Sequence, residues 1–214
     1  MRVIRTNDGS SSIFLPEMNE TYHSKFGAVT ESLHVFIKSG LRYHAQNDLN
    51  ILEIGFGTGL NVFLSLIENI SGKRTIYFES IEKFPLHENI INQLNFLKKE
   101  NQSLFRQVHD APWNKEVVLR GNFILHKREL DLLNFQSEKR FDLVYFDAFA
   151  PNKQPEMWTN DVFENIYKHM NIGGVLVTYS AKGSVRRTME SVGFIVERIQ
   201  GPPGKREMLR AKKL

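Results

Sequence analysis

The 214-residue sequence, with a net charge of +4, is 41% hydrophobic and 24% charged, which is typical of one globular domain with a sizeable core and excludes intrinsic disorder. It contains no cysteine, so disulfides, thiolate metal sites, iron–sulfur clusters and cysteine nucleophiles are excluded. No apolar run approaches the roughly 20 residues of a membrane-spanning helix, and residues 1–12 are polar, so we expect a cytoplasmic protein with no membrane partner.

Residues 1–48 predict an N-terminal cap that belongs to the same domain as the rest of the chain. Apolar residues alternate at 2–6 and 11–15 around an Asp-Gly turn, a pattern typical of a β-hairpin. Apolar residues then recur at helical spacing from Val29 to Ile37, and Gly40 ends the predicted helix. The cap is therefore expected to be a hairpin followed by a helix.

From residue 49 onward, short apolar strands alternate with helical stretches, which predicts an α/β fold with a mostly parallel sheet covered on both faces. Residues 49–214 form the main part of the domain. The predicted strands span residues 49–54, 75–81, 122–127, 141–146, 174–179, 194–198 and 207–211. The predicted helices span residues 59–70, 86–99, 160–170 and 184–191. Residues 101–121 show no strong periodicity and predict an irregular excursion on the surface.

A glycine-rich turn follows the first of these strands, in the sequence ILEIGFGTGLN at residues 51–61. Glycine permits positive φ angles and a close approach of backbone to a ligand, and the next helix presents unpaired N–H groups. The spacing fits neither the G-x-G-x-x-G of dinucleotide enzymes nor a G-K-[ST] phosphate loop. It resembles the first motif of the S-adenosylmethionine-dependent methyltransferases, and a structural turn without a ligand is the alternative. The resemblance assigns to a cofactor site the residues Glu53, Gly55, Gly57, Gly59 and Asn61.

Two further carboxylates follow neighbouring strands. Glu82 ends the second strand, where a carboxylate can accept two hydrogen bonds from a ribose diol, and we prefer it to Glu79, which lies within the strand. Asp131 follows the third strand and is our choice for the contact with an adenine amino group. Each acid taken singly also fits a solvated loop residue.

A nearly unbroken apolar strand at 141–146 ends at Asp147, and a loop with two prolines follows. Ligands of open α/β sheets bind at the carboxyl ends of the strands, so this position predicts a reacting carboxylate. An aspartate that merely caps the next turn is the alternative. Phe149 and Trp158 in the loop are candidates for stacking on a base, although either also fits the core. Tyr145 points to the other face of its strand and is expected in the core.

Three segments in chain order resemble the methyltransferase half of the MnmC-like tRNA wobble-uridine modification enzymes. They are DAFAPNKQPEMW at 147–158, TYSAKGSVRR at 178–187 and GPPGKREML at 201–209. The similarity extends to Tyr22 and Glu31 of the cap, which the resemblance assigns to the cofactor site. It implies a Rossmann-like, seven-stranded, mostly parallel sheet of the S-adenosylmethionine-dependent methyltransferase type.

The resemblance also implies an activity. In the family, a methyl group passes from S-adenosyl-L-methionine to the aminomethyl nitrogen of 5-aminomethyl-2-thiouridine at the tRNA wobble position, and no metal is expected. The sequence has no second glycine-rich strand–helix unit that would bind a flavin. We therefore expect no FAD and a stand-alone methyltransferase, with a separate enzyme as candidate supplier of the aminomethyl substrate. Relatives often have Gly where this chain has Leu130, which weakens the adenine assignment of Asp131.

Basic residues are concentrated near the C-terminus. Residues 182–214 hold nine Lys and Arg against three Glu, whereas the rest of the chain holds 19 basic and 21 acidic side chains. This asymmetry fits a face that binds a polyanion or a solvated tail. The expected rim for phosphates of the tRNA anticodon arm consists of Lys153, Lys182, Arg186, Arg187, Lys205 and Arg206.

Methyl transfer to an amine defines the expected role of Asp147. A carboxylate stabilises an ammonium ion and raises its pKa, so Asp147 is interpreted as an acceptor that orients the amine and receives the departing proton. Two other functions remain open on the sequence alone. One is a methyltransferase that acts on another amine, and the other is a nucleic-acid-binding module with a vestigial cofactor pocket.

Overall fold

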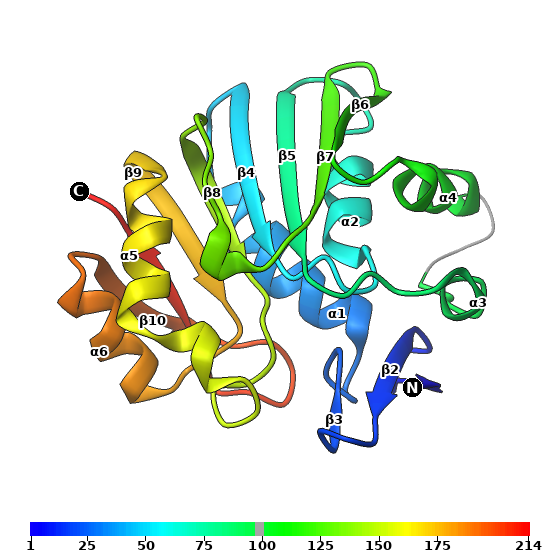
Figure 1. The fold of residues 1–214 in the computed structure, drawn as a ribbon, viewed down its shortest axis with the longest axis horizontal. Helices are drawn as coiled ribbons and strands as arrows, with labels where there is room; N and C mark the ends of the chain where they lie inside the picture. Colours follow the sequence, from blue (N-terminus) through cyan, green and yellow to red (C-terminus); the bar gives the residue numbers. More distant parts are fainter. Residues whose placement is uncertain (97–100) are drawn as a thin grey trace.

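The alternating strands form one open sheet in the computed structural model, which describes residues 1–96 and 101–214 (Figure 1). The strands of this sheet are β4 (Asp48–Ile54), β5 (Thr75–Glu82), β6 (Lys115–Arg120), β7 (Phe123–Glu129), β8 (Phe141–Phe146), β9 (Met170–Thr178), β10 (Ile195–Gln200) and β11 (Glu207–Lys212). Their order is β10-β11-β9-β8-β4-β5-β7-β6. Within the described residues the sheet thus has eight strands, the seven predicted ones and β6.

Parallel pairing aligns the carboxyl ends of the central strands. β4 pairs with both β5 and β8, and Ile54 lies opposite Ile81 on one side and Phe146 on the other. β7 and β9 extend the parallel ladder outward, whereas β6 pairs antiparallel with β7, and β11 pairs antiparallel with both β9 and the edge strand β10. The loops that follow β4, β5, β7 and β8 consequently open at one edge of the sheet, where α/β proteins bind ligands.

Helices cover both faces of the sheet. One face packs against α2 (Leu60–Glu68) and α4 (Gln102–Asp110), and the other against α5 (Asn160–Lys168) and α6 (Gly183–Ser191). Tyr145 of β8 belongs to the first core and Phe146 to the second, as expected of a strand buried on both faces. No helix in the described part of the chain has the length and apolar character needed to cross a bilayer. Shorter helical turns are α3 (Glu88–Ile91), η4 (Leu132–Asn134) and η5 (Pro155–Trp158).

The N-terminal segment supplies a small sheet and one bent helix. The predicted hairpin is formed by β1 (Arg2–Arg5) and β2 (Ser11–Leu15), and a short third strand, β3 (Glu20–Thr21), pairs with β2. The helix starts as α1 (Ala28–Ser32) and continues as the π-helical segment η1 (Leu33–Lys38), before the turn η2 (Leu41–Tyr43). Figure 1 shows β2 and β3 beyond the lower ends of the central strands.

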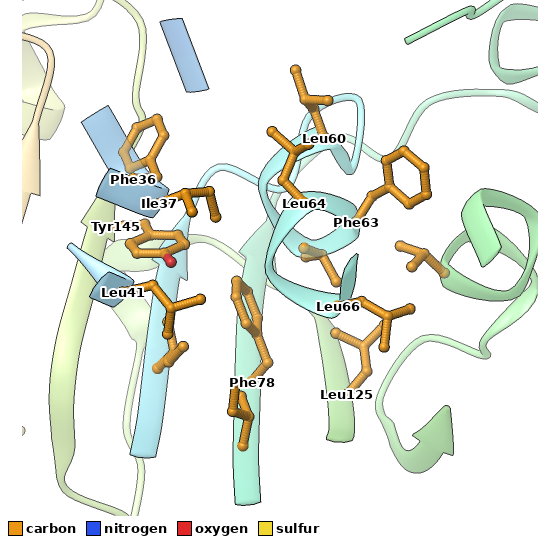
Figure 2. Packing of buried hydrophobic residues seen from close by; sticks show 14 of the residues in the cluster. Phe36, Ile37, Leu41, Leu60, Phe63, Leu64, Leu66, Phe78, Leu125 and Tyr145 are labelled. Carbon is orange, nitrogen blue, oxygen red and sulfur yellow. The ribbon is translucent and has the colours of Figure 1, made fainter. Parts of the chain in front are cut away.

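The bent helix is part of the main core. Phe36 and Ile37 are buried in the same cluster as Leu60 of α2 and Phe78 of β5. The ring of Phe36 lies 5.1 Å from that of Tyr145, and Figure 2 shows the two side by side. A Cβ at Gly40 would lie 2.5 Å from the carbonyl oxygen of Phe36, so the close turn after this helix requires glycine.

Two predicted segments differ in the structure, one in its extent and one in its type. A helix was predicted at 86–99; within residues 86–96 only α3 forms, and residues 97–99 of that prediction lie outside the described residues. Residues 101–121 were predicted to be irregular, but they form α4 and β6. α4 buries Leu104, Phe105 and Val108 along one face, and this short apolar stripe was missed because polar residues surround it. β6 is an edge strand with mostly exposed charged residues, a composition that hides the strand pattern.

We expect Phe36→Ala to lower the free energy of unfolding by about 3–5 kcal/mol, because it removes a buried ring between the bent helix and the sheet. Urea unfolding followed by circular dichroism measures the change. Leu33→Ala on the same segment is the matched control, since Leu33 is 40% exposed and should cost less than about 1 kcal/mol. Equal losses for the two variants would contradict the packing described for this helix.

Candidate active site

A cavity of about 800 Å³ opens at the carboxyl edge of the sheet. Its floor comes from the loops that follow β4, β5, β7 and β8. Its other wall comes from the N-terminal segment between Leu15 and Phe26, together with Glu31. The C-terminal part of the chain contributes Tyr179 and Lys205. The cavity is large enough for more than one small-molecule moiety.

The glycine turn forms part of the cavity floor, and its backbone requires glycine. Gly55, Gly57 and Gly59 have φ angles of 92°, 50° and 70°. A Cβ at Gly55 would lie 2.8 Å from the carbonyl oxygen of Asp147, and one at Gly57 would lie 3.2 Å from the ring of Tyr22. The turn therefore allows two backbone segments and a ring to approach closely, and α2 starts directly after it.

Two histidines that the sequence analysis left unassigned hold this turn. The Nε2 atom of His23 lies 2.8 Å from the hydroxyl of Thr58, and the Nε2 atom of His109 lies 3.1 Å from the carbonyl oxygen of Thr58. Burial lowers the pKa of both histidines to about 4, so both rings are neutral at pH 7. His23 thereby ties the N-terminal segment to the glycine turn.

Glu82 lines the cavity with its carboxylate held in place by backbone donors. The N–H of Gly57 donates to one carboxylate oxygen at 3.0 Å, and the N–H of Phe84 donates to the other at 2.9 Å. Burial raises the pKa of Glu82, although these hydrogen bonds oppose the shift. Each oxygen keeps a free lone pair, so Glu82 remains able to accept hydrogen bonds from a diol.

Asp131 also lines the cavity, next to Leu130 and Leu132. Its carboxylate accepts a hydrogen bond from the N–H of Leu133 at 3.1 Å and forms an ion pair with the ammonium group of Lys83 at 2.7 Å. The hydrogen bond from Lys83 lowers the pKa of Asp131. Asp131 is thus an ionised acceptor between two leucines, an environment that suits a flat heterocycle with an amino group.

Asp147 follows directly after β8 and lines the cavity. Its backbone N–H donates to the carbonyl of Ile54 at 3.0 Å, and its carboxylate accepts a hydrogen bond from the side-chain amide of Asn61 at 2.8 Å. Burial raises the pKa of Asp147 to about 7, against the opposing effects of Asn61 and Lys205. A carboxyl group with this pKa exchanges protons near neutral pH, which suits general acid–base chemistry.

Lys205 lies inside the cavity and not on a surface rim. Its ammonium group pairs with Glu31 at 2.8 Å and lies 4.1 Å from the centre of the Tyr179 ring. Glu31, assigned from the sequence to the cofactor site, is thus the partner of a lysine that had been assigned to phosphate binding. The hydroxyl of Tyr179, a residue that sequence analysis did not single out, donates to the carbonyl of Ala148 at 2.8 Å.

Aromatic residues line one wall beside Asp147. Tyr22 and Phe149 both line the cavity, and their rings make an edge-to-face contact at 5.1 Å. Trp158 is only 6% exposed and packs against Phe146 at 4.8 Å, while its indole N–H donates to the carbonyl of Phe149 at 2.9 Å. Of the two alternatives for Trp158, a residue that stacks on a base or a core residue, the structure shows the second, because the ring is buried and its N–H holds the backbone of Phe149.

The remaining predicted cations differ in what they contact. Lys153 lines the cavity, and its ammonium donates to the carbonyl of Met18 at 2.9 Å, which fastens the loop after β8 to the N-terminal segment. Arg186 pairs with Glu190 at 2.9 Å on α6. Lys182, Arg187 and Arg206 are exposed outside the cavity. The expected rim therefore reduces to these exposed side chains and Arg186.

Glu53 lies behind the cavity and does not line it. Its side chain is fully buried, and the hydroxyl of Ser80 donates to one of its carboxylate oxygens. Within residues 1–96 and 101–214, no group of three His, Asp or Glu side chains is arranged to hold a metal ion.

The cavity has the features of a site for S-adenosylmethionine. The backbone of Gly55 and Gly57 lines it, Glu82 offers acceptors for ribose hydroxyls, and Asp131 offers an acceptor between apolar walls. The profile of a family described as S-adenosyl-L-methionine-dependent methyltransferase matches residues 97–214, more than half of the chain. The chain belongs to this family.

Two known proteins are similar in sequence to most of this methyltransferase. The bifunctional protein MnmC of tRNA 5-methylaminomethyl-2-thiouridine biosynthesis from Leptospira interrogans is 33% identical over 210 residues, which cover 90% of this chain and 32% of that protein. The protein of the same name from Marinomonas is 31% identical over 214 residues, covering 90% of this chain and 31% of that protein. The methyltransferase thus spans about a third of the length of these relatives.

Solved structures of other proteins superpose on this chain. The crystal structure of MNMC2 from Aquifex aeolicus superposes with a TM-score of 0.84 at 26% sequence identity, covering 99% of this chain and 70% of that one. DesVI from Streptomyces venezuelae, at 9% identity and a TM-score of 0.51, shares the fold. The expected α/β fold of the methyltransferase class is confirmed, with one strand more than predicted.

We expect Gly57→Asp to abolish binding of S-adenosylmethionine by the methyltransferase, because the new side chain enters the space beside Tyr22 and adds a carboxylate next to Glu82. Isothermal titration calorimetry measures the affinity. Gly72→Asp is the matched control, since Gly72 also has a positive φ, 65°, but has open space around it and lies in a distant loop. Unchanged affinity in a folded Gly57→Asp protein would contradict the assignment of the cofactor site.

Proposed function

We propose that this chain transfers a methyl group from S-adenosyl-L-methionine to the aminomethyl nitrogen of 5-aminomethyl-2-thiouridine at the wobble position of tRNA, which forms 5-methylaminomethyl-2-thiouridine. The observation that carries the proposal is similarity over 90% of the chain to proteins named for the biosynthesis of this nucleoside. A half-buried carboxylate with a raised pKa in the lining of the cavity is consistent with this chemistry.

The cofactor half of the cavity consists of the glycine turn and two acids. In this proposal the backbone of Gly55 and Gly57 approaches the cofactor, Glu82 accepts hydrogen bonds from the ribose and Asp131 accepts one from the adenine amino group. Gly59, which the sequence assigned to this site, does not line the cavity and faces the ring of Phe56 instead. When bound, the cofactor supplies a methyl group on a positively charged sulfonium. Asn61 and Asp147 face the cavity next to this half.

The amine substrate must lose a proton to react. If its pKa resembles that of lysine, about 10.4, roughly one molecule in 2,500 is neutral at pH 7, which costs about 4.6 kcal/mol. Alignment of two bound reactants recovers on the order of 7–11 kcal/mol, so positioning outweighs this cost without a strong base. In this proposal Asp147 orients the amine and accepts its proton as the new N–C bond forms, and its pKa of about 7 suits that role.

The substrate half of the cavity has an aromatic wall and exposed cations nearby. Phe149 lines this half next to Tyr22, and we propose that it contacts the wobble base. We assign the phosphates of the anticodon arm to exposed cations outside the cavity, among them Lys182 and Arg206. A separate enzyme that supplies the aminomethyl nucleoside is part of the proposal.

Nucleoside analysis of tRNA from a strain that lacks this chain tests the proposed substrate. We expect 5-methylaminomethyl-2-thiouridine to disappear and its unmethylated precursor to accumulate. Unchanged tRNA nucleosides together with measurable binding of S-adenosylmethionine would favour a methyltransferase that acts on another amine. Absence of cofactor binding would favour the nucleic-acid-binding module.

We expect Asp147→Asn to reduce single-turnover methylation of undermodified tRNA by about 10²–10⁴-fold at pH 8, because the variant lacks the charge and the proton acceptor. Asp147 acts in its ionised form, so wild-type activity falls as pH drops below about 7. Deprotonation of the amine adds a further dependence on pH. A plot of log kcat/KM against pH should therefore have a slope of about two below pH 7 and about one above it, whereas the asparagine variant keeps a slope of about one throughout.

Binding of S-adenosylmethionine should survive Asp147→Asn, since the side chain keeps its size. Asp48→Asn serves as the control, because Asp48 is an exposed carboxylate at the opposite end of the central strands. Full activity of Asp147→Asn would show that this carboxylate is a loop cap, and the proton would then leave by another route.

We expect Lys182→Ala and Arg206→Ala each to weaken tRNA binding and to lower the slope of log K against log salt concentration by about 1, as expected when one phosphate contact is lost. Arg120→Ala is the control, because Arg120 is exposed on the edge strand β6, at the other side of the sheet. Filter binding at several salt concentrations measures the slopes. Identical slopes in all three variants would remove Lys182 and Arg206 from the tRNA interface.

A further inference from the structure

Two buried oxygen atoms next to the cavity have no hydrogen-bond donor. They are Oε1 of Glu53 and Oδ1 of Asn61, and neither has a partner among the described residues. The Glu53 side chain is fully buried and that of Asn61 is 3% exposed. Buried polar atoms in proteins are almost always paired, because an unpaired one costs about 1–3 kcal/mol. These two oxygen atoms therefore need a hydrogen-bond donor.

The other polar atoms of the two side chains are paired. The hydroxyl of Ser80 donates to Oε2 of Glu53, and the amide nitrogen of Asn61 donates to Asp147 at 2.8 Å. Asn61 is also a hydrogen-bonding neighbour of Glu53. Asn61 at the start of α2 thus bridges two carboxyl groups, one from β4 and one from the end of β8.

A single added proton allows one hydrogen bond that pairs both of these oxygen atoms. An ionised carboxylate only accepts hydrogen bonds and cannot satisfy the amide oxygen of Asn61, whereas a neutral carboxyl group has one O–H to donate. A proton on Oε1 of Glu53 gives each of the two oxygens a role in one hydrogen bond. The opposite amide orientation would turn the oxygen of Asn61 toward Asp147 and would require the proton to be on Asp147.

We propose that Glu53 is the protonated member of this pair, and that its O–H holds the amide of Asn61 with the N–H directed at Asp147. Glu53 is then a positioning residue that keeps the Asp147 carboxylate ionised and oriented, and it has no direct contact with the ligand.

The charges around the two carboxyl groups favour a proton on Glu53 and a negative charge on Asp147. Burial raises the pKa of Glu53 well above its usual value, and the nearby carboxylates of Asp147 and Glu82 raise it further, against the opposing effects of the hydrogen bonds with Ser80 and Asn61. The nearby phenol of Tyr145 supplies no positive charge. Asp147, although also buried, has Asn61 and Lys205 to stabilise its charge.

Two other titratable groups face Asp147. Glu31 opposes ionisation of Asp147, but its own charge is paired with Lys205. Tyr179 lies near Asp147, and burial together with that carboxylate raises the pKa of its phenol, so the phenol stays neutral. The proton therefore belongs on Glu53.

Glu53→Gln tests the proposal, because glutamine reproduces a protonated glutamate. Its N–H can donate to Asn61 while its oxygen accepts from Ser80. Folding of the wild type takes up a proton at Glu53, so its unfolding free energy falls as pH rises from the usual glutamate pKa toward the raised value in the folded state. The unfolding free energy of the Glu53→Gln variant does not fall in this way, because glutamine does not titrate. We expect the stability of Glu53→Gln relative to wild type to increase with pH over this interval, as measured by urea unfolding.

Glu79→Gln is the matched control on the adjacent strand. Glu79 is also buried, at 2% exposure, but it pairs with Arg128 at 2.9 Å. Removal of its charge should destabilise the protein across the same pH range. A Glu53→Gln protein that is destabilised by the same amount at every pH would show that Glu53 is ionised, and it would overturn the proposal without reference to methylation.

The catalytic consequence rests on the proposed role of Asp147 and has its own test. Glu53→Ala leaves Asn61 unsupported, so we expect kcat to fall by about tenfold and the inflection of the pH–rate profile to move above pH 7. Glu53→Gln should restore both properties. Failure of glutamine to rescue, with cofactor affinity intact, would show that the ionised carboxylate of Glu53 is needed. If no variant or wild type methylates tRNA, the proposed function fails while the stability result stands.

Discussion

A close backbone contact between the glycine turn and the loop after β8 is the constraint on which the cavity depends. The N–H of Asp147 donates to the carbonyl of Ile54 at 3.0 Å, and any Cβ at Gly55 would lie 2.8 Å from the carbonyl oxygen of Asp147. This contact continues the parallel pairing of β4 and β8 beyond the ends of the strands. It brings Asn61 within hydrogen-bond distance of the Asp147 side chain, and so couples the turn to the carboxylate.

The cavity that results has more acidic than basic side chains in its described lining, seven Asp and Glu against four Lys. Glu82 and Asp147 line it, Glu53 lies directly behind it, and Glu31 is neutralised by Lys205. Burial raises the pKa of the first three of these groups. Such an environment favours cationic ligands, and both the sulfonium of the family's cofactor and a protonated amine are cations. The N-terminal segment closes the cavity and thereby increases the strength of these interactions.

Long segments with clear periodicity were predictable, whereas short or edge segments were not. The strands from β4 to β11 were placed from their apolar runs, except β6, whose charged residues reflect its position at the sheet edge. α4 was missed because three apolar residues form its buried face. The roles of Trp158 and Lys205 could not be read from the sequence either, since an aromatic or basic residue in a loop has no periodic pattern that reveals what it contacts.

The sequence by itself determined the glycine turn and the acids at strand ends, because backbone conformation and the parallel order of strands constrain which residues can occupy those positions. Only the tertiary structure decided what each side chain contacts. It separated Glu53, buried behind the cavity, from Glu82, which lines it, and paired Lys205 with Glu31, 174 residues away. The physical reason is that burial and charge pairing depend on segments distant in the chain, which local sequence patterns do not encode.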